Sequence, residues 1–177
     1  GQEVVPNSGC GSWLLEPQST NTVRYSEDFS QWVQTSSPTL TSGQLAPDGT
    51  LSATKISGAI GSSNILLTGS STTSTTASRS IYARTVSGTG TAKLMSYFGN
   101  TNNLFTLTEE WQRFELTGSV SAGGDNFYID FRDNAQTLSE FIIWGAQSEV
   151  QSYATSYIPT TQGASSTRLQ DIATNSG

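Results

Sequence analysis

The sequence predicts an all-β protein, an antiparallel two-sheet β-sandwich of the jelly-roll type. Three observations support this fold class. About ten short apolar stretches follow one another along the chain, turn residues separate them, and none has the spacing of an amphipathic helix. A length of 177 residues suits one domain with a single hydrophobic core.

The composition excludes several classes of function. The chain has no His, which removes most hydrolase triads and most zinc sites. Its net charge of −6 argues against a nucleic-acid partner, because phosphate binding requires clustered cations. No apolar run approaches the ~20 residues of a membrane span, so no membrane partner is expected. Cys10 is alone, so no internal disulfide can form.

The chain divides into three predicted regions. Residues 1–22 contain one short apolar segment between Gly- and Pro-containing flanks and are predicted to be an N-terminal docking arm. Residues 23–160 carry the strand-like stretches and are predicted to form the β-sandwich domain. Residues 161–177 are polar and are predicted to be a C-terminal tail or linker.

The first half of the sandwich region begins with a short strand and a turn, beneath which Trp32 is expected to pack. Residues 38–57 predict a hairpin, because the sequence Ala-Pro-Asp-Gly at 46–49 favours a Pro-initiated turn. A short apolar strand follows, and then residues 69–76, whose Ser/Thr-rich composition predicts an exposed loop.

The middle of the chain shows clear strand alternation. In residues 79–86, Ile81 and Ala83 fall on one face while Tyr82 and Arg84 fall on the other, which indicates a half-buried strand. The next stretch follows a Gly-containing turn, so these two strands are predicted to pair as a hairpin. Two further strands are expected within residues 103–120.

Two late stretches complete the pattern. The sequence FYIDFR at residues 127–132 places three apolar side chains on one face and Tyr128, Asp130 and Arg132 on the other. Residues 140–160 contain the densest apolar block, at positions 141–144, and predict a buried strand in which Gly145 lies where a large side chain would not fit. Three tryptophans with apolar neighbours are predicted to be packing residues: Trp13, Trp111 and Trp144.

Three stretches carry a family resemblance: WLLEPQSTNTVRYSEDFSQW, TLTEEWQRFEL and IIWGAQSEVQSYATSYIPTTQGASSTRLQDIA. Together they resemble a carbohydrate-binding-module-like domain that is common in bacteriophage tail-fibre, tailspike and other virion proteins, and in some bacterial surface proteins. The resemblance spans nearly the whole chain. It implies a jelly roll on a virion surface or outside the cell, either as a homotrimer or attached to a larger fibre protein.

The resemblance to jelly-roll carbohydrate-binding modules also raises the question of a structural calcium ion. The motif SEDFSQW at residues 26–32 is similar to the turn that begins such modules, and Glu27 and Asp28 could supply oxygen ligands. However, Ser30 and Trp144 occupy positions where acidic residues would be expected. No cofactor is therefore expected, and structural calcium stays open as an alternative.

Sugar binding requires an aromatic ring and planar polar side chains that hydrogen-bond to hydroxyls. If the strands pair, six such residues would fall on neighbouring strands: Tyr82, Arg84, Tyr97, Tyr128, Asp130 and Arg132. The sequence therefore predicts a non-catalytic domain that adheres to a cell-surface or matrix polysaccharide or glycan. The same residues could instead be ordinary cross-strand pairs on a solvated sheet.

Two further hypotheses about the function stay open. The domain could be a structural virion module, a spacer, cap or decoration whose polar face contacts other protein chains. Glu109-Glu110, Asp130-Asp133 and Glu140 could in principle supply the acid and base of a glycosidase, but none lies in a distinctive motif. No catalytic residue and no metal ligand is predicted.

Overall fold

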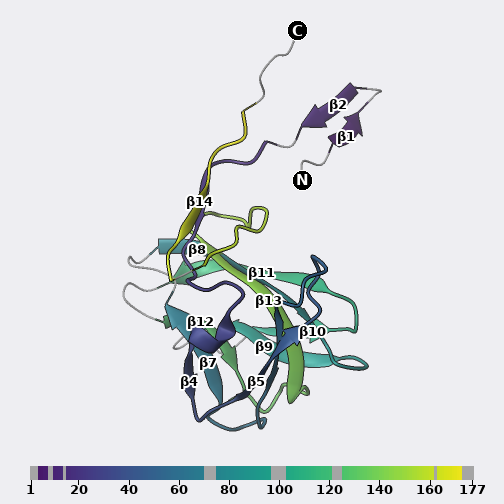
Figure 1. Ribbon diagram of the computed structural model, residues 1–177, viewed down its shortest axis with the longest axis vertical. Coiled ribbons are helices and arrows are strands. Elements are labelled where there is room, and N and C mark those ends of the chain that lie inside the picture. Colours follow the sequence, from purple (N-terminus) through teal and green to yellow (C-terminus); the bar gives the residue numbers. More distant parts are fainter. Residues whose placement is uncertain are drawn as a thin grey trace.

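A computed structural model describes residues 4–7, 10–13, 15–69, 75–96, 103–120, 125–161 and 163–172. Most of these residues form two antiparallel five-stranded sheets (Figure 1). The only helix among the described residues is the short 3-10 helix η1 (Phe29–Gln31), and none is long and apolar enough to cross a membrane.

The first sheet has the strand order β10-β9-β12-β7-β4. Its strands are β4 (Val33–Thr35), β7 (Ile65–Gly69), β9 (Gly90–Ser96), β10 (Leu104–Leu107) and β12 (Asp125–Asp130). The second sheet has the order β11-β8-β13-β6-β5. Its strands are β5 (Thr39–Gln44), β6 (Ala53–Ser57), β8 (Thr75–Arg84), β11 (Gln112–Val120) and β13 (Glu140–Glu149). The chain passes repeatedly from one sheet to the other, which confirms the predicted jelly-roll β-sandwich.

The hydrophobic core lies between the two sheets. Alternate residues of the strands point inward, as Ile81 and Ala83 do from β8 and Phe127 and Ile129 do from β12. Trp32 is buried against this core, with its ring centroid 5.0 Å from that of Phe29 and 5.5 Å from that of Phe127. The predicted face of each of these strands is therefore correct, and so is the packing of Trp32.

Local pairing was predicted correctly in one case and wrongly in another. Strands β5 and β6 pair as the expected antiparallel hairpin across the turn at 46–49, where the Gly49 amide donates to the Ala46 carbonyl. The predicted hairpin of β8 with the following strand is wrong. Strand β8 pairs with β11 and β13, whereas β9 pairs with β10 and β12. The connection at 85–89 crosses between the sheets instead of reversing within one.

Both ends of the chain leave the sandwich side by side (Figure 1). Strand β3 (Ser19–Asn21) pairs antiparallel with β14 (Ser166–Arg168), and an Arg168–Glu16 ion pair joins the same two segments. Near the N-terminus, β1 (Val4–Asn7) pairs with β2 (Cys10–Trp13). Strand β14 lies within residues 161–177, so part of the region predicted to be a polar tail is a strand.

The motif residues that carry the family resemblance fasten these ends to β13. Asn21 is fully buried, and its side-chain amide donates to the carbonyls of Ala146 and Ile158. Glu149 is also fully buried, and its carboxylate accepts hydrogen bonds from neutral groups of residues 19, 147 and 155. The polar motif residues Asn21 and Glu149 therefore have a structural role.

Candidate functional site

The six residues predicted to bind sugar do not form one face. Tyr82 and Arg84 lie on β8 in the second sheet, whereas Tyr128 and Asp130 lie on β12 in the first sheet. Each pair points away from the core, so the two pairs lie on opposite outer surfaces of the sandwich. The expectation of neighbouring strands is wrong because β8 and β12 do not pair. Tyr97 lies outside the described residues.

On the first sheet, the charged side chains are engaged with each other. The Asp130 carboxylate accepts from Nη2 of Arg132 at 2.6 Å and from its Nε at 3.0 and 3.1 Å. The Arg132 guanidinium also lies 5.9 Å from the ring centroid of Tyr128, which is itself only 6% exposed. The ring that could recognise a sugar is therefore largely buried, and the guanidinium, although partly exposed, already pairs with Asp130.

The charges of this group are also electrostatically coupled. Burial alone would raise the pKa of Asp130, but hydrogen bonds from the Arg132 side chain and backbone outweigh it. The positive charges of Arg132 and Lys93 act in the same direction, so the pKa lies below its ordinary value. Asp130 thus stays ionised within an intramolecular ion pair.

On the second sheet, Tyr82 lies in an aromatic cluster on the outer face. Its ring centroid is 5.3 Å from that of Trp144 and 6.4 Å from that of Tyr157, and the Arg113 guanidinium lies 5.7 Å away. Arg84 lies over the ring of Trp111 at 5.4 Å. Trp144 and Trp111 are thus packing residues, as predicted, but they pack outside the sandwich core.

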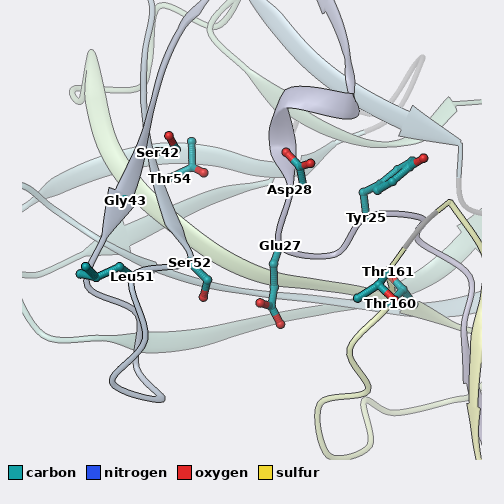
Figure 2. A pocket seen from close by; sticks show the side chains of 10 residues that line it. All are labelled: Tyr25, Glu27, Asp28, Ser42, Gly43, Leu51, Ser52, Thr54, Thr160 and Thr161. Carbon is teal, nitrogen blue, oxygen red and sulfur yellow. The ribbon is translucent and has the colours of Figure 1, made fainter.

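A solvent-facing cleft lies elsewhere, beside the hairpin of β5 and β6 (Figure 2). Its volume is about 530 Å³, within the usual range of ligand sites. Figure 2 shows Leu51 and Ser52 on one side, Tyr25 and Thr160 on the other, and Glu27 between them. The lining residues are Tyr25, Glu27, Asp28, Ser42, Gly43, Leu51, Ser52, Thr54, Thr160 and Thr161.

Local backbone features shape both walls of this cleft. On the hairpin side, the register of β5 with β6 shifts between Thr41 and Gln44, and Gly43 adopts a φ of +77°. This bulge places Ser42 and Gly43 against the cleft. Gly43 suits the bulge because a side chain at this φ would be strained.

On the opposite wall, reciprocal hydrogen bonds hold residues 25–28 against the C-terminal segment. The Ser26 amide donates to Oγ1 of Thr160 at 2.9 Å, and the Thr160 amide donates to Oγ of Ser26 at 2.8 Å. Asp28 caps η1 by accepting from the Ser30 amide. Segments far apart in sequence therefore build this wall, which is held in place before any ligand binds.

The cleft is acidic. Glu27 and Asp28 both line it, and Oε1 of Glu27 accepts a hydrogen bond from the Tyr157 hydroxyl at 3.0 Å. Burial raises the pKa of Tyr157, and the nearby negative charge of Glu27 raises it further. The hydroxyl of Tyr157 therefore remains a donor to Glu27 throughout the ordinary pH range.

The cleft is also linked to the aromatic cluster. Ser52 lines it and accepts a 2.7 Å hydrogen bond from the indole nitrogen of Trp144. A ligand that contacts Ser52 would change the surroundings of that indole. The emission of the chain's four tryptophans is consequently expected to include a contribution from Trp144 that responds to occupancy.

The residues do not fit a structural calcium ion. Among the described residues, no group of three or more His, Cys, Asp or Glu side chains is placed to hold a metal. Glu27 and Asp28 are the two carboxylates at the implied position, and Figure 2 shows them pointing in opposite directions, so they do not converge on one ion that takes six to eight oxygen ligands.

Part of this cleft was recognisable in the sequence. The motif at 26–32 was singled out for calcium, and it contains Glu27 and Asp28. Tyr25, Ser52 and Thr160 were missed because their proximity depends on tertiary contacts. The one hint was that the motifs SEDF and SYIPT both belong to the stretches that carry the family resemblance. In the structure these two motifs meet through hydrogen bonds between Ser26 and Thr160.

No protein-family model matches the chain, and no curated protein matches it by sequence. Among solved structures, it is similar to the CBM22-1 xylan-binding domain from Paenibacillus barcinonensis Xyn10C, with a TM-score of 0.49 and 14% identity. That match covers 77% of this chain and 94% of the other. The CBM22-2 xylan-binding domain of the same protein has a TM-score of 0.48 and 12% identity, covering 76% of this chain and 98% of the other.

A phage protein also matches. The enzymatically active domain of bacteriophage CBA120 tailspike protein 4 has a TM-score of 0.40 and 14% identity. The match covers 72% of this chain and 21% of that one. At such identities these similarities concern the fold and do not locate a binding residue.

Proposed function

We propose that this domain binds a carbohydrate, without catalysing a reaction on it, in the cleft beside the β5–β6 hairpin. The observation that carries the proposal is the combination of groups in one cavity of about 530 Å³. Tyr25 supplies a ring for the apolar face of a sugar, and Ser and Thr hydroxyls with two carboxylates supply hydrogen-bonding partners. The exposed Leu51 adds apolar surface at the rim.

The affinity of a single site is expected to be weak. A few hydrogen bonds and one ring contact replace well-hydrated sugar hydroxyls, so little net free energy is gained. Several copies on one fibre would raise the avidity. This fits the proposal, based on the sequence resemblance, that the domain belongs to a phage fibre, a tailspike or a bacterial surface protein. Its location would then be the virion surface or outside the cell, where adhesion to a polysaccharide is its role.

Replacing Tyr25 with Ala tests the proposal. A glycan array identifies the ligand, and titration followed by tryptophan emission measures its affinity. Aromatic contacts contribute roughly 0.5–1.5 kcal/mol, so the variant is expected to bind up to about tenfold more weakly. Tyr153→Ala is the matched control, because Tyr153 is 50% exposed and does not line the cleft.

Two results would contradict the proposal. Equal affinity of the Tyr25→Ala variant and the wild type would exclude the cleft. An array without any bound glycan, together with association of chains in solution, would favour a structural virion module instead. The predicted role of the six sequence-derived residues stays a prediction.

A further inference from the structure

We propose that the cleft selects glycans that carry free amino groups, preferring them to neutral glycans and disfavouring glycans with carboxylate groups. This inference rests on the proposed function, since the cleft must first bind a sugar. It concerns the charge of the ligand, which neither the fold nor the family resemblance specifies.

The first argument is the sign of the charge around the cleft. Glu27 and Asp28 are acidic, and none of the described lining residues is Lys or Arg. The whole chain carries a net charge of −6, so its long-range field adds to the local one. A uronic acid would bring a like charge into this environment, whereas a protonated amino sugar would bring the opposite charge.

The second argument is that both carboxylates keep capacity for a ligand. Oε1 of Glu27 accepts from Tyr157, and Oδ1 of Asp28 accepts from Ser30. Within the described part of the chain, the other oxygen of each carboxylate has no hydrogen-bond donor, and the ion pairs there do not include either residue. Asp130 differs from Glu27 and Asp28, because its carboxylate already forms an ion pair with Arg132.

The third argument concerns which cation would fit. An ammonium group has three donors and no acceptor, and it matches carboxylate oxygens that can only accept. It needs no closed coordination sphere, whereas a calcium ion takes six to eight oxygen ligands. Figure 2 shows the Glu27 and Asp28 carboxylates pointing in opposite directions, so each is available to a separate ammonium group of an oligosaccharide, and the two do not converge on one metal ion.

The test compares three tetrasaccharides of equal length: β-1,4-linked glucosamine, β-1,4-linked N-acetylglucosamine and α-1,4-linked galacturonate. Binding is measured by calorimetry and tryptophan emission at low salt with EDTA. Exposed ion pairs give roughly 0.2–1 kcal/mol each, so two such pairs are expected to make the glucosamine oligomer bind about twofold to thirtyfold more tightly than the acetylated one. The galacturonate oligomer should bind most weakly, and added salt should reduce the preference.

The Glu27→Gln/Asp28→Asn double variant is expected to bring the affinity ratio of the first two oligomers close to one. A second double variant, Glu110→Gln/Glu140→Gln, removes the same net charge outside the cleft and should keep the ratio, which separates local recognition from general attraction. Asn at position 28 preserves a good helix cap. Thermal unfolding of each variant verifies folding.

Equal affinity of the wild type for the glucosamine and acetylated oligomers would overturn this inference and leave sugar binding in the cleft intact. The same holds if the Glu27→Gln/Asp28→Asn variant keeps the wild-type ratio, or if EDTA abolishes the preference. By contrast, an array on which no glycan binds would reject the proposed function itself.

Discussion

Replacing Asn21 with Ala should remove a large part of the folding stability, because Asn21 joins three segments that are distant in sequence. Its Nδ2 donates to the carbonyls of Ala146 at 3.1 Å and Ile158 at 2.8 Å. Its Oδ1 accepts from the amides of Val23 at 3.1 Å and Ser148 at 3.0 Å. Asn21 itself is fully buried, so water does not replace these bonds without rearrangement.

The expected loss is about 4 kcal/mol. A hydrogen bond contributes roughly 0.5–1.5 kcal/mol net, and Asn21 makes four such bonds to main-chain groups. A natural domain has a free energy of unfolding of roughly 5–15 kcal/mol, so this loss is a large fraction of the total. Asn21→Asp should also be strongly destabilising, because it keeps an acceptor for the two amides but turns a buried carboxylate oxygen toward the carbonyls of Ala146 and Ile158.

Urea unfolding followed by both tryptophan emission and circular dichroism measures this effect, provided that the two transitions coincide. Asn134→Ala is the control, since Asn134 is exposed and its replacement should change stability by less than about 0.5 kcal/mol. If Asn21→Ala loses less than about 1 kcal/mol, the side chain does not fasten the chain ends to β13, and the structural role assigned to the motif is wrong.

Three other perturbations follow from the same contacts. Gly145→Ala should destabilise the fold by about 1–3 kcal/mol in chemical unfolding, because Gly145 has a φ of +63° and a Cβ would lie 3.3 Å from the rings of Tyr157 and Tyr82. A stable Gly145→Ala variant would contradict the tight packing. Arg132→Ala should lower stability by leaving buried Asp130 without its partner, but it should keep glycan affinity within about twofold. Loss of binding would instead indicate that the sugar binds at the outer face of β12. Because the folded pKa of Asp130 is lowered, its stabilising contribution is complete above the unfolded value of about 3.9 and is lost as the pH falls through the folded pKa. In acid unfolding, Asp130→Asn should therefore flatten the pH dependence in that window, and an unchanged profile would refute the assignment.

Much of the fold was predictable because strand alternation is a local property. Ile81 and Ala83 face the core while Tyr82 faces outward, as the period of two requires. The turn at 46–49 also predicted its hairpin correctly. The sharp pattern of FYIDFR likewise placed Phe131 in the core and Asp130 on the other side.

Strand partners were less predictable, because in a jelly roll consecutive strands often belong to different sheets. The short connection between β8 and β9 has the length of a hairpin, yet it crosses the sandwich. The predicted site combined outward-facing residues of β8 and β12 for the same reason. Their faces were correct, but nothing in the local sequence says which sheet a strand joins.

The cleft was not predictable from local pattern either. Tyr25 and Thr160 are far apart in sequence, and they meet because Ser26 and Thr160 exchange hydrogen bonds. Ser52 reaches the same cavity from the hairpin on the opposite side. Such a site depends on three segments closing around an edge of the sandwich.

Mapping of amide chemical shifts during titration with a bound oligosaccharide tests the central claim most directly. We expect the largest shifts at Gly43, Ser52 and Thr161, with a change in tryptophan emission over the same concentration range. Shifts confined to the outer face of β9 and β12, or shifts absent for every glycan tested, would contradict sugar binding in this cleft.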